Sequence, residues 1–78
     1  MRNAGEVGIR RTTVKSSAVK EVGYDQVTLT LEVVFHNGSV YQYFGIPQRI
    51  YDGLIAADSV GLFLNQNVKD QFRYEKKS

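Results

Sequence analysis

Apolar and polar residues alternate most regularly between residues 28 and 44, where two runs flank the dipeptide Asn37-Gly38. The apolar side chains of the first run recur at every second position, at Val27, Leu29, Leu31, Val33 and Phe35. A period of two is typical of a half-buried β-strand. Asn-Gly between two such runs favours a two-residue type I′ turn, in which both central residues have positive φ. The stretch therefore predicts a β-hairpin.

A two-residue loop at Asn37-Gly38 fixes the register of this hairpin. The predicted cross-strand pairs are Phe35–Val40, Val34–Tyr41, Val33–Gln42, Glu32–Tyr43 and Leu31–Phe44. Directly opposed residues point to the same face of a sheet. The core face is therefore predicted to hold Leu29, Leu31, Val33, Phe35, Val40 and Phe44, with Gln42 intruding among them. The opposite face is predicted to hold Thr28, Thr30, Glu32, Val34, Tyr41 and Tyr43.

The segment before the hairpin predicts one more strand, over Ser17–Tyr24, which the short connection Asp25-Gln26 joins to Val27. With that connection, the opposed pairs are Tyr24–Val27 and Val22–Leu29. Gly23 lies inside this strand, and a glycine there indicates a bulge or a close approach of another part of the backbone.

Two helices are predicted after the hairpin. The first runs from about Pro47 to Ala57, with Ile50 and Leu54 on its apolar stripe. Proline suits the first helical position, because its missing N–H is not needed there. Ser59 is a favourable N-cap for the second helix, which runs from about residue 60 to residue 69. The residues after it suit either a last helical turn or a short edge strand.

This order of elements, βββαα, predicts an α+β fold in which a three-stranded antiparallel meander is packed on one face by two short helices. A short C-terminal strand is compatible with the pattern. Residues 1–14, which are rich in arginine and have no apolar period, are predicted to be a flexible basic arm. Residues 15–74 are predicted to form the single domain that 78 residues allow, and residues 75–78 a charged tail.

The composition narrows the classes of function. Cysteine is absent, which excludes disulfides and thiolate chemistry and suits a reducing compartment. No apolar run approaches the roughly 20 residues of a membrane span, and the first residues lack the apolar core of a signal peptide, so we expect a soluble, cytoplasmic protein. A single histidine offers no metal cluster, and no cofactor or small-molecule substrate is predicted. The net charge of +2 and the pI near 9.0 are compatible with a nucleic-acid partner.

An ordered series of short motifs runs through the chain: Ser16-Ser17, Val22-Gly23-Tyr24-Asp25, Leu31-Glu32-Val33-Val34-Phe35 with Asn37-Gly38, Tyr41-Gln42-Tyr43, Ile46-Pro47, Ala57-Asp58-Ser59-Val60-Gly61 and Phe63-Leu64-Asn65. This series resembles the KTSC domain, a small domain found at the C-terminus of some lysyl-tRNA synthetases and as a stand-alone bacterial or phage protein. The resemblance covers about Ser16 to Tyr74, and the tripeptide YxY is the family's central hallmark. The resemblance implies the fold of that family and carries no established activity. RNA binding has been suggested for the family, so RNA is the partner that the resemblance implies.

Catalytic motifs are missing from the sequence. It contains no G-x-x-x-x-G-K-[ST], no G-x-G-x-x-G and no G-x-S-x-G. Ser39, His36 and Asp25 are the residue types of a catalytic triad, but no oxyanion hole or cleft is predicted beside them. Asp52 and Asp58 lie six positions apart, nearly opposite across a helix, and do not form a carboxylate pair. The sequence therefore predicts a protein that is not an enzyme.

Tyr41 and Tyr43 are the candidate binding residues. Two aromatic rings on an open sheet face stack nucleic-acid bases in known RNA-binding sheets. Lys20, Arg10 and Arg11 are the candidate contacts to phosphate. We therefore predict a small non-catalytic module that binds RNA, in preference to DNA, through this tyrosine pair.

Two other interpretations of the same residues stay open. The tyrosines also suit a structural role in which they cover the sheet, and Glu32, predicted opposite Tyr43, would repel a phosphate backbone. The alternative function is a protein–protein interaction or accessory module with no nucleic-acid ligand. An unpaired strand edge at Ala18–Tyr24 or Val40–Phe44 would suit that role.

Overall fold

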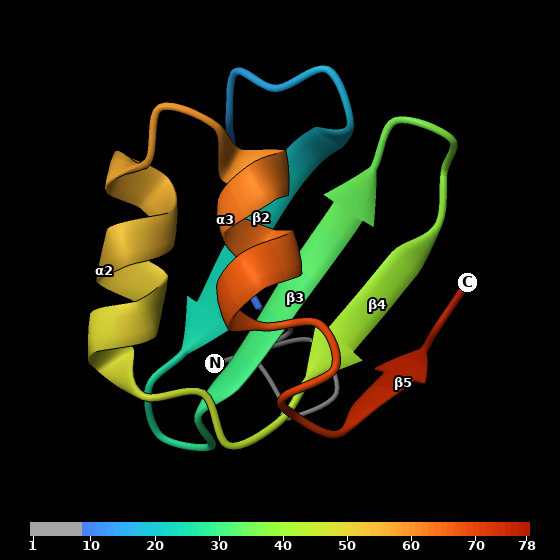
Figure 1. The fold of residues 1–78 in the computed structure, drawn as a ribbon. Helices are drawn as coiled ribbons and strands as arrows, with labels where there is room; N and C mark the ends of the chain where they lie inside the picture. Colours follow the sequence, from blue (N-terminus) through green and yellow to red (C-terminus); the bar gives the residue numbers. More distant parts are fainter. Residues whose placement is uncertain (1–8) are drawn as a thin grey trace.

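The computed structural model describes residues 9–78, which form one antiparallel sheet and two helices (Figure 1). The sheet has five strands in the order β1-β2-β3-β4-β5. The strands are β1 (Arg11–Thr13), β2 (Val19–Asp25), β3 (Thr30–Phe35), β4 (Val40–Tyr43) and β5 (Tyr74–Lys76). The helices are α2 (Gln48–Ala56) and α3 (Val60–Asn67), and they connect β4 to β5. The predicted α+β class is confirmed.

The predicted number of strands is wrong, because the sheet has five and not three. One additional strand is β1, which lies within the predicted arm. The other is β5, the short C-terminal edge strand that the sequence left open as an alternative. Residues 1–8 of the predicted arm lie outside the described residues. Both outer strands are only three residues long and exposed, so no apolar period marks them in the sequence. Their pairing with β2 and β4 holds them in place.

Both helices lie on one face of the sheet, where α3 crosses in front of β2 and β3 (Figure 1). The buried core forms between them, from Val19, Val22, Leu31, Val33, Tyr43, Ile46, Leu54, Val60, Leu64 and Val68. In Figure 1, β4 and β5 lie to one side of α3, with no helix in front of them. The structure therefore has a covered half and an open half on the same face of the sheet.

The helix ends lie close to the predicted ones. Pro47 is the N-cap of α2 and not its first residue, and the helix ends at Ala56. The N-cap of α3 is Ser59, as predicted, and its Oγ accepts a hydrogen bond from the Leu62 backbone N–H at 3.2 Å. The last turn of α3 ends two residues before the predicted end at Lys69.

The predicted connection between β2 and β3 is wrong. The observed loop spans residues 26–29, and the strands pair Tyr24 with Leu31 and Val22 with Val33. The side chain of Asp25 explains the longer loop, because its carboxylate accepts hydrogen bonds from the backbone N–H groups of residues 27 and 28. Val27 and Leu29, predicted to face the core, are instead 87% and 40% exposed.

Gly23 is the point at which the chain before β1 comes close to β2. A Cβ at this position would overlap the carbonyl oxygen of Arg10 and lie 2.6 Å from a methyl carbon of Ile9. The predicted close approach is therefore confirmed. The pairing of β2 with β3 is also irregular between Val19 and Glu21.

The predicted register between β3 and β4 is wrong by one residue. Phe35 pairs through its N–H with the Ser39 carbonyl at 2.9 Å, so the loop holds residues 36–38. Gly38 alone of the central Asn-Gly pair has positive φ, at 94°. The observed pairs are Leu31–Tyr43, Glu32–Gln42, Val33–Tyr41 and Val34–Val40. Both tyrosines therefore lie on the core face with the helices, and Gln42 moves to the opposite face.

Candidate functional site

The changed register places Tyr41 and Tyr43 in a row of aromatic side chains, which we call the aromatic strip: Phe35, Tyr41, Tyr43 and Tyr74. The Tyr41 ring lies 5.6 Å from Phe35, edge to face, and 6.3 Å from Tyr43 in a stacked arrangement. Tyr74 joins the strip because β5 pairs it with Tyr43, and its ring lies 5.7 Å from both tyrosines of β4. Three strands therefore contribute to one continuous aromatic surface.

The exposed fraction of the side chains differs along the aromatic strip, from buried in the core to open to solvent. Tyr43 is 2% exposed and belongs to the buried core, Phe35 and Tyr41 are half-buried, and Tyr74 is 57% exposed. The strip lines a hollow of about 310 Å³ together with Asn37, Ser39, Lys69 and Asp70. We call this the tyrosine hollow. It opens beside the end of α3, where the chain turns at Asp70 with a φ of 69°. The rings of Tyr41 and Tyr74 both belong to its lining.

Charge in the tyrosine hollow comes from one lysine and one aspartate, Lys69 and Asp70. Lys76 is paired with Tyr41 in the register of β4 and β5, so a second basic residue borders the strip. Burial raises the pKa of Tyr43 to about 12, with smaller contributions from Tyr41, Tyr74 and Asp70. The Tyr43 hydroxyl is therefore neutral at physiological pH.

The three basic residues predicted to accompany the tyrosines lie elsewhere. Arg10 and Lys20 are exposed, and neither lines the tyrosine hollow. Arg11 is on the opposite face of the sheet, where its Nε donates to a carboxylate oxygen of Glu32 at 2.5 Å. The structure therefore brings Tyr41 and Tyr43 together and replaces their predicted basic neighbours with Lys69 and Lys76. The assignment of Lys20, Arg10 and Arg11 to phosphate binding stays a prediction.

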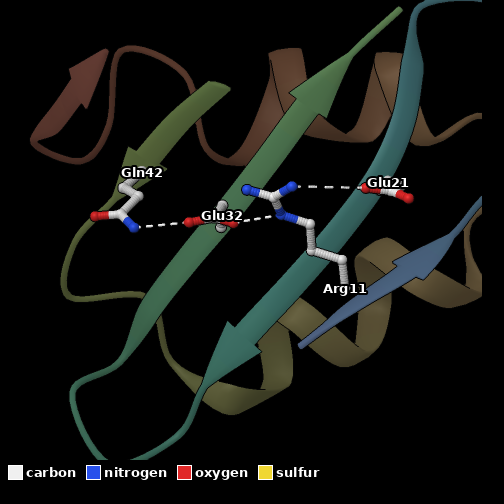
Figure 2. A network of polar contacts seen from close by, with 4 residues as sticks. All are labelled: Arg11, Glu21, Glu32 and Gln42. Atoms are coloured by element: carbon white, nitrogen blue, oxygen red, sulfur yellow. Dashed lines mark hydrogen bonds and ion pairs between the residues drawn. The ribbon is translucent and has the colours of Figure 1, made fainter. Parts of the chain in front are cut away.

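A polar network occupies the face opposite the helices (Figure 2). Glu32 lies at its centre and is 6% exposed. Besides Arg11, it accepts a hydrogen bond from the Gln42 side-chain amide at 2.7 Å, and the Arg11 guanidinium also lies 3.9 Å from Glu21. Glu32 was predicted to face Tyr43 and to repel phosphate. In the structure its charge is compensated, and it lies on the other face from the aromatic strip.

The residues of the imagined catalytic triad are not brought together. His36 is exposed in the β3–β4 loop, and its Nε2 lies 2.9 Å from the Ser16 carbonyl oxygen. Asp25 pairs with Thr30 at the opposite end of β3. Within residues 9–78, no group of three histidine, cysteine, aspartate or glutamate side chains is placed to hold a metal ion. In the same part of the chain, neither helix has the length and apolar character needed to cross a membrane.

The sequence missed Phe35 because the predicted register placed it on the other face from the tyrosines. It missed Lys69 and Tyr74 because they follow the tyrosines by about 30 residues. One signal did point to the correct register. In the predicted register Gln42 had to intrude on the apolar face while two tyrosines faced away from it. Shifting β4 by one residue removes both conflicts at once.

Comparison with known proteins gives one consistent result. The model of the family described as the KTSC domain matches residues 15–72. A protein of Tsukamurella paurometabola is 42% identical over 60 residues, which are 77% of this chain and 90% of that protein. A lysine–tRNA ligase of Nostoc punctiforme is 38% identical over 64 residues, which are 82% of this chain but 11% of the ligase. The crystal structure of a KTSC domain protein from Yersinia pestis superimposes with a TM-score of 0.85 at 33% identity, over 91% of this chain and all of that one.

Proposed function

The chain belongs to the KTSC domain family, and we propose that it is a non-catalytic module that binds single-stranded RNA in the tyrosine hollow. One observation carries the proposal: Tyr41, Tyr74 and Lys69 line the same open hollow. Aromatic rings and a cation side by side are the two elements that proteins use to hold single-stranded nucleic acid.

Base stacking supplies the first part of the binding energy. Stacking of a base on an aromatic side chain contributes about 1–3 kcal/mol in known single-strand binders. Tyr74 is the most exposed residue of the strip. The centroid of its ring lies 5.7 Å from that of the Tyr41 ring. Phe35 packs edge-on against Tyr41 and restricts its ring. The platform is therefore held in place before a base arrives, which reduces the ordering cost of binding.

Electrostatics supply the second part. Lys69 lines the hollow and Lys76 borders it, whereas Asp70 is the one acidic residue in the lining. The predicted repulsion from Glu32 does not apply, because that carboxylate lies on the other face and is paired with Arg11. The hollow and its border therefore carry one more positive than negative charge, which suits a phosphate backbone.

The relatives favour RNA over other single strands. In the lysine–tRNA ligases of Nostoc punctiforme and Trichormus variabilis, the matching region makes up 11% of a protein whose name states that its substrate is a tRNA. We propose that the region has the same kind of partner in the present chain. A protein partner with no RNA is the alternative outcome of the test below.

The test is a titration of isotope-labelled protein with a short single-stranded RNA at low salt, followed by backbone amide shifts. We expect shifts at residues 41–43, 69–70 and 74–76, and an affinity that falls steeply with salt. Tyr74→Ser removes the exposed ring and is expected to weaken binding about 5- to 150-fold, from the energy of one stacked base. Tyr74→Phe keeps the ring and is the matched control, with an affinity near that of the wild type.

The absence of shifts at the aromatic strip at high micromolar RNA would refute the proposal. Equal affinities for Tyr74→Ser and Tyr74→Phe, with clear binding by both, would show that the strip does not take the base.

A further inference from the structure

A second hollow lies beside the tyrosine hollow, on the other side of Phe35. Its volume is about 560 Å³, and three separate segments line it: residues 15–18 before β2, Phe35 at the end of β3, and residues 58–69 around α3. Phe35 and Lys69 line both hollows. The two hollows are therefore neighbours on one surface, with Lys69 at their boundary. We call the second one the serine hollow.

We infer that the serine hollow holds a backbone phosphate of the same RNA strand whose base stacks in the tyrosine hollow, an inference that rests on the proposed function. The polar groups that line it include Lys15, Ser17, Asn65 and Lys69. All four side chains end in hydrogen-bond donors. Phosphate oxygens accept such hydrogen bonds, and lysine in addition neutralises their charge.

These donors have no side-chain partner among residues 9–78. Within the described part of the chain, the side chains of Lys15, Ser17, Asn65 and Lys69 form no hydrogen bond or ion pair with one another or with other residues. Asp58 is the one acidic residue in the lining among the residues that the structure describes. Two lysines and one aspartate leave the hollow with a net positive charge, which a single phosphate group complements.

The wall of the serine hollow is held in place by internal hydrogen bonds. The hydroxyl of Ser16 accepts from the backbone N–H groups of Ala18 and Val19, at 3.2 and 3.1 Å. The Ser16 carbonyl oxygen lies 2.9 Å from His36 Nε2, which ties the segment to the β3–β4 loop. Ser16 therefore shapes the segment, and this leaves Ser17 and Lys15 exposed beside it.

Gly61 offers a way to test the hollow without disturbing the fold. A Cβ at this position would lie 3.8 Å from the Ala18 Cβ and 3.9 Å from the Ser16 Oγ, which are ordinary contact distances. Gly61 lies in the first turn of α3, which contains no acidic residue. Gly61→Glu adds a better helix former and a carboxylate that favours a helix N-terminus. The same carboxylate fills the hollow and repels a phosphate.

The experiment measures the affinity of one short single-stranded RNA for the wild type and for two pairs of variants across a range of salt. Lys15→Gln and Gly61→Glu change the serine hollow. Arg49→Gln and Gln66→Glu make the same charge changes at exposed positions that line neither hollow. Loss of one phosphate contact makes the slope of log K against log salt shallower by about 0.7 for a single strand. At 0.1 M salt this corresponds to an affinity for RNA that is about fivefold lower. We expect this loss for Lys15→Gln, at least this loss for Gly61→Glu, and none for the two controls.

A second measurement separates the phosphate from the base. Adenosine is expected to shift only the amides around the tyrosine hollow, at residues 41–43, 69–70 and 74–76, whereas adenosine 5′-monophosphate is expected to shift those of Ser17 and Gly61 as well. If RNA shifts the aromatic strip but Lys15→Gln and Gly61→Glu bind like the wild type, the phosphate site is wrong and the proposed function stands. If no RNA binds the wild type, both are wrong.

Discussion

Replacing Arg11 by alanine is the most severe test of the polar network on the sheet face opposite the helices. The Arg11 Nε–H group donates to Glu32 at 2.5 Å, and Glu32 is almost fully buried at the centre of β3. Arg11→Ala leaves that carboxylate with the Gln42 amide as its remaining side-chain partner. A buried charge that loses its partner is destabilising because little water reaches it.

The size of the effect follows from how much of each side chain is exposed. Loss of one partner from a fully buried ion pair costs about 3–5 kcal/mol. Here the Arg11 side chain is 39% exposed, so water partly replaces the guanidinium and the expected cost falls toward that of a charged hydrogen bond, about 2 kcal/mol. In a domain of this size, that lowers the melting temperature by roughly 8–16 °C.

The assay is a double-mutant cycle measured by urea unfolding. Glu32→Gln removes the charge and leaves Arg11 to be hydrated, so the double variant Arg11→Ala, Glu32→Gln is expected to be more stable than the sum of the single changes implies, by about 1 kcal/mol. Lys77→Ala is the control, because it breaks a pair with Glu75 that is 3.1 Å long but exposed on both sides, and such pairs contribute less than about 1 kcal/mol. A loss for Arg11→Ala no larger than that for Lys77→Ala, or no coupling in the cycle, would refute this reasoning.

Three further predictions concern stability. Gly23→Ala is expected to cost about 2–3 kcal/mol, because a Cβ there overlaps the Arg10 carbonyl and the backbone has to move; an unfolding midpoint equal to the wild type would contradict it. Gly38→Ala meets no neighbour, so its expected cost of about 1–2 kcal/mol is that of a left-handed conformation alone, and Gly38→Asn is expected to cost less. The raised pKa of Tyr43, about 12, means that the folded protein holds this proton more tightly than the unfolded chain. Its stabilisation is complete below the ordinary tyrosine pKa of 10.0 and is lost as the pH rises through about 12. Urea midpoints measured between pH 9 and pH 12 are expected to fall less for Tyr43→Phe than for the wild type. Midpoints that fall equally with pH in both proteins would be evidence against this role of Tyr43.

The sequence predicted the elements of the covered half more accurately than it predicted the way they meet. Leu31, Val33 and Leu54 are in the core as their periods indicate, and Ser59 caps α3. The error in register came from the loop. Asn-Gly suits a two-residue turn, but it also suits a longer loop in which Gly38 alone has positive φ. The turn residues alone do not select between the two, whereas the position of Gln42 and the contacts of the whole sheet do.

The candidate site depended on that choice. Tyr41 and Tyr43 were recognised from the sequence as the informative pair, but the predicted register placed them beside Glu32 and away from the helices. The observed register places them with Phe35, Tyr74 and Lys69 instead. Tyr74 lies in a three-residue strand with no pattern of its own, and Lys69 follows a helix end. These two residues become neighbours of the tyrosines only in the folded chain, where α3 packs on the sheet and β5 pairs with β4.

The most direct test of the tyrosine hollow as the RNA site is the set of nuclear Overhauser contacts between RNA base protons and protein side chains in the complex. The proposed function predicts contacts from a base to the ring protons of Tyr74 and Tyr41, and to the Lys69 side chain. Contacts confined to the face of Arg11 and Gln42, or to side chains outside the hollow such as Lys20, would contradict it.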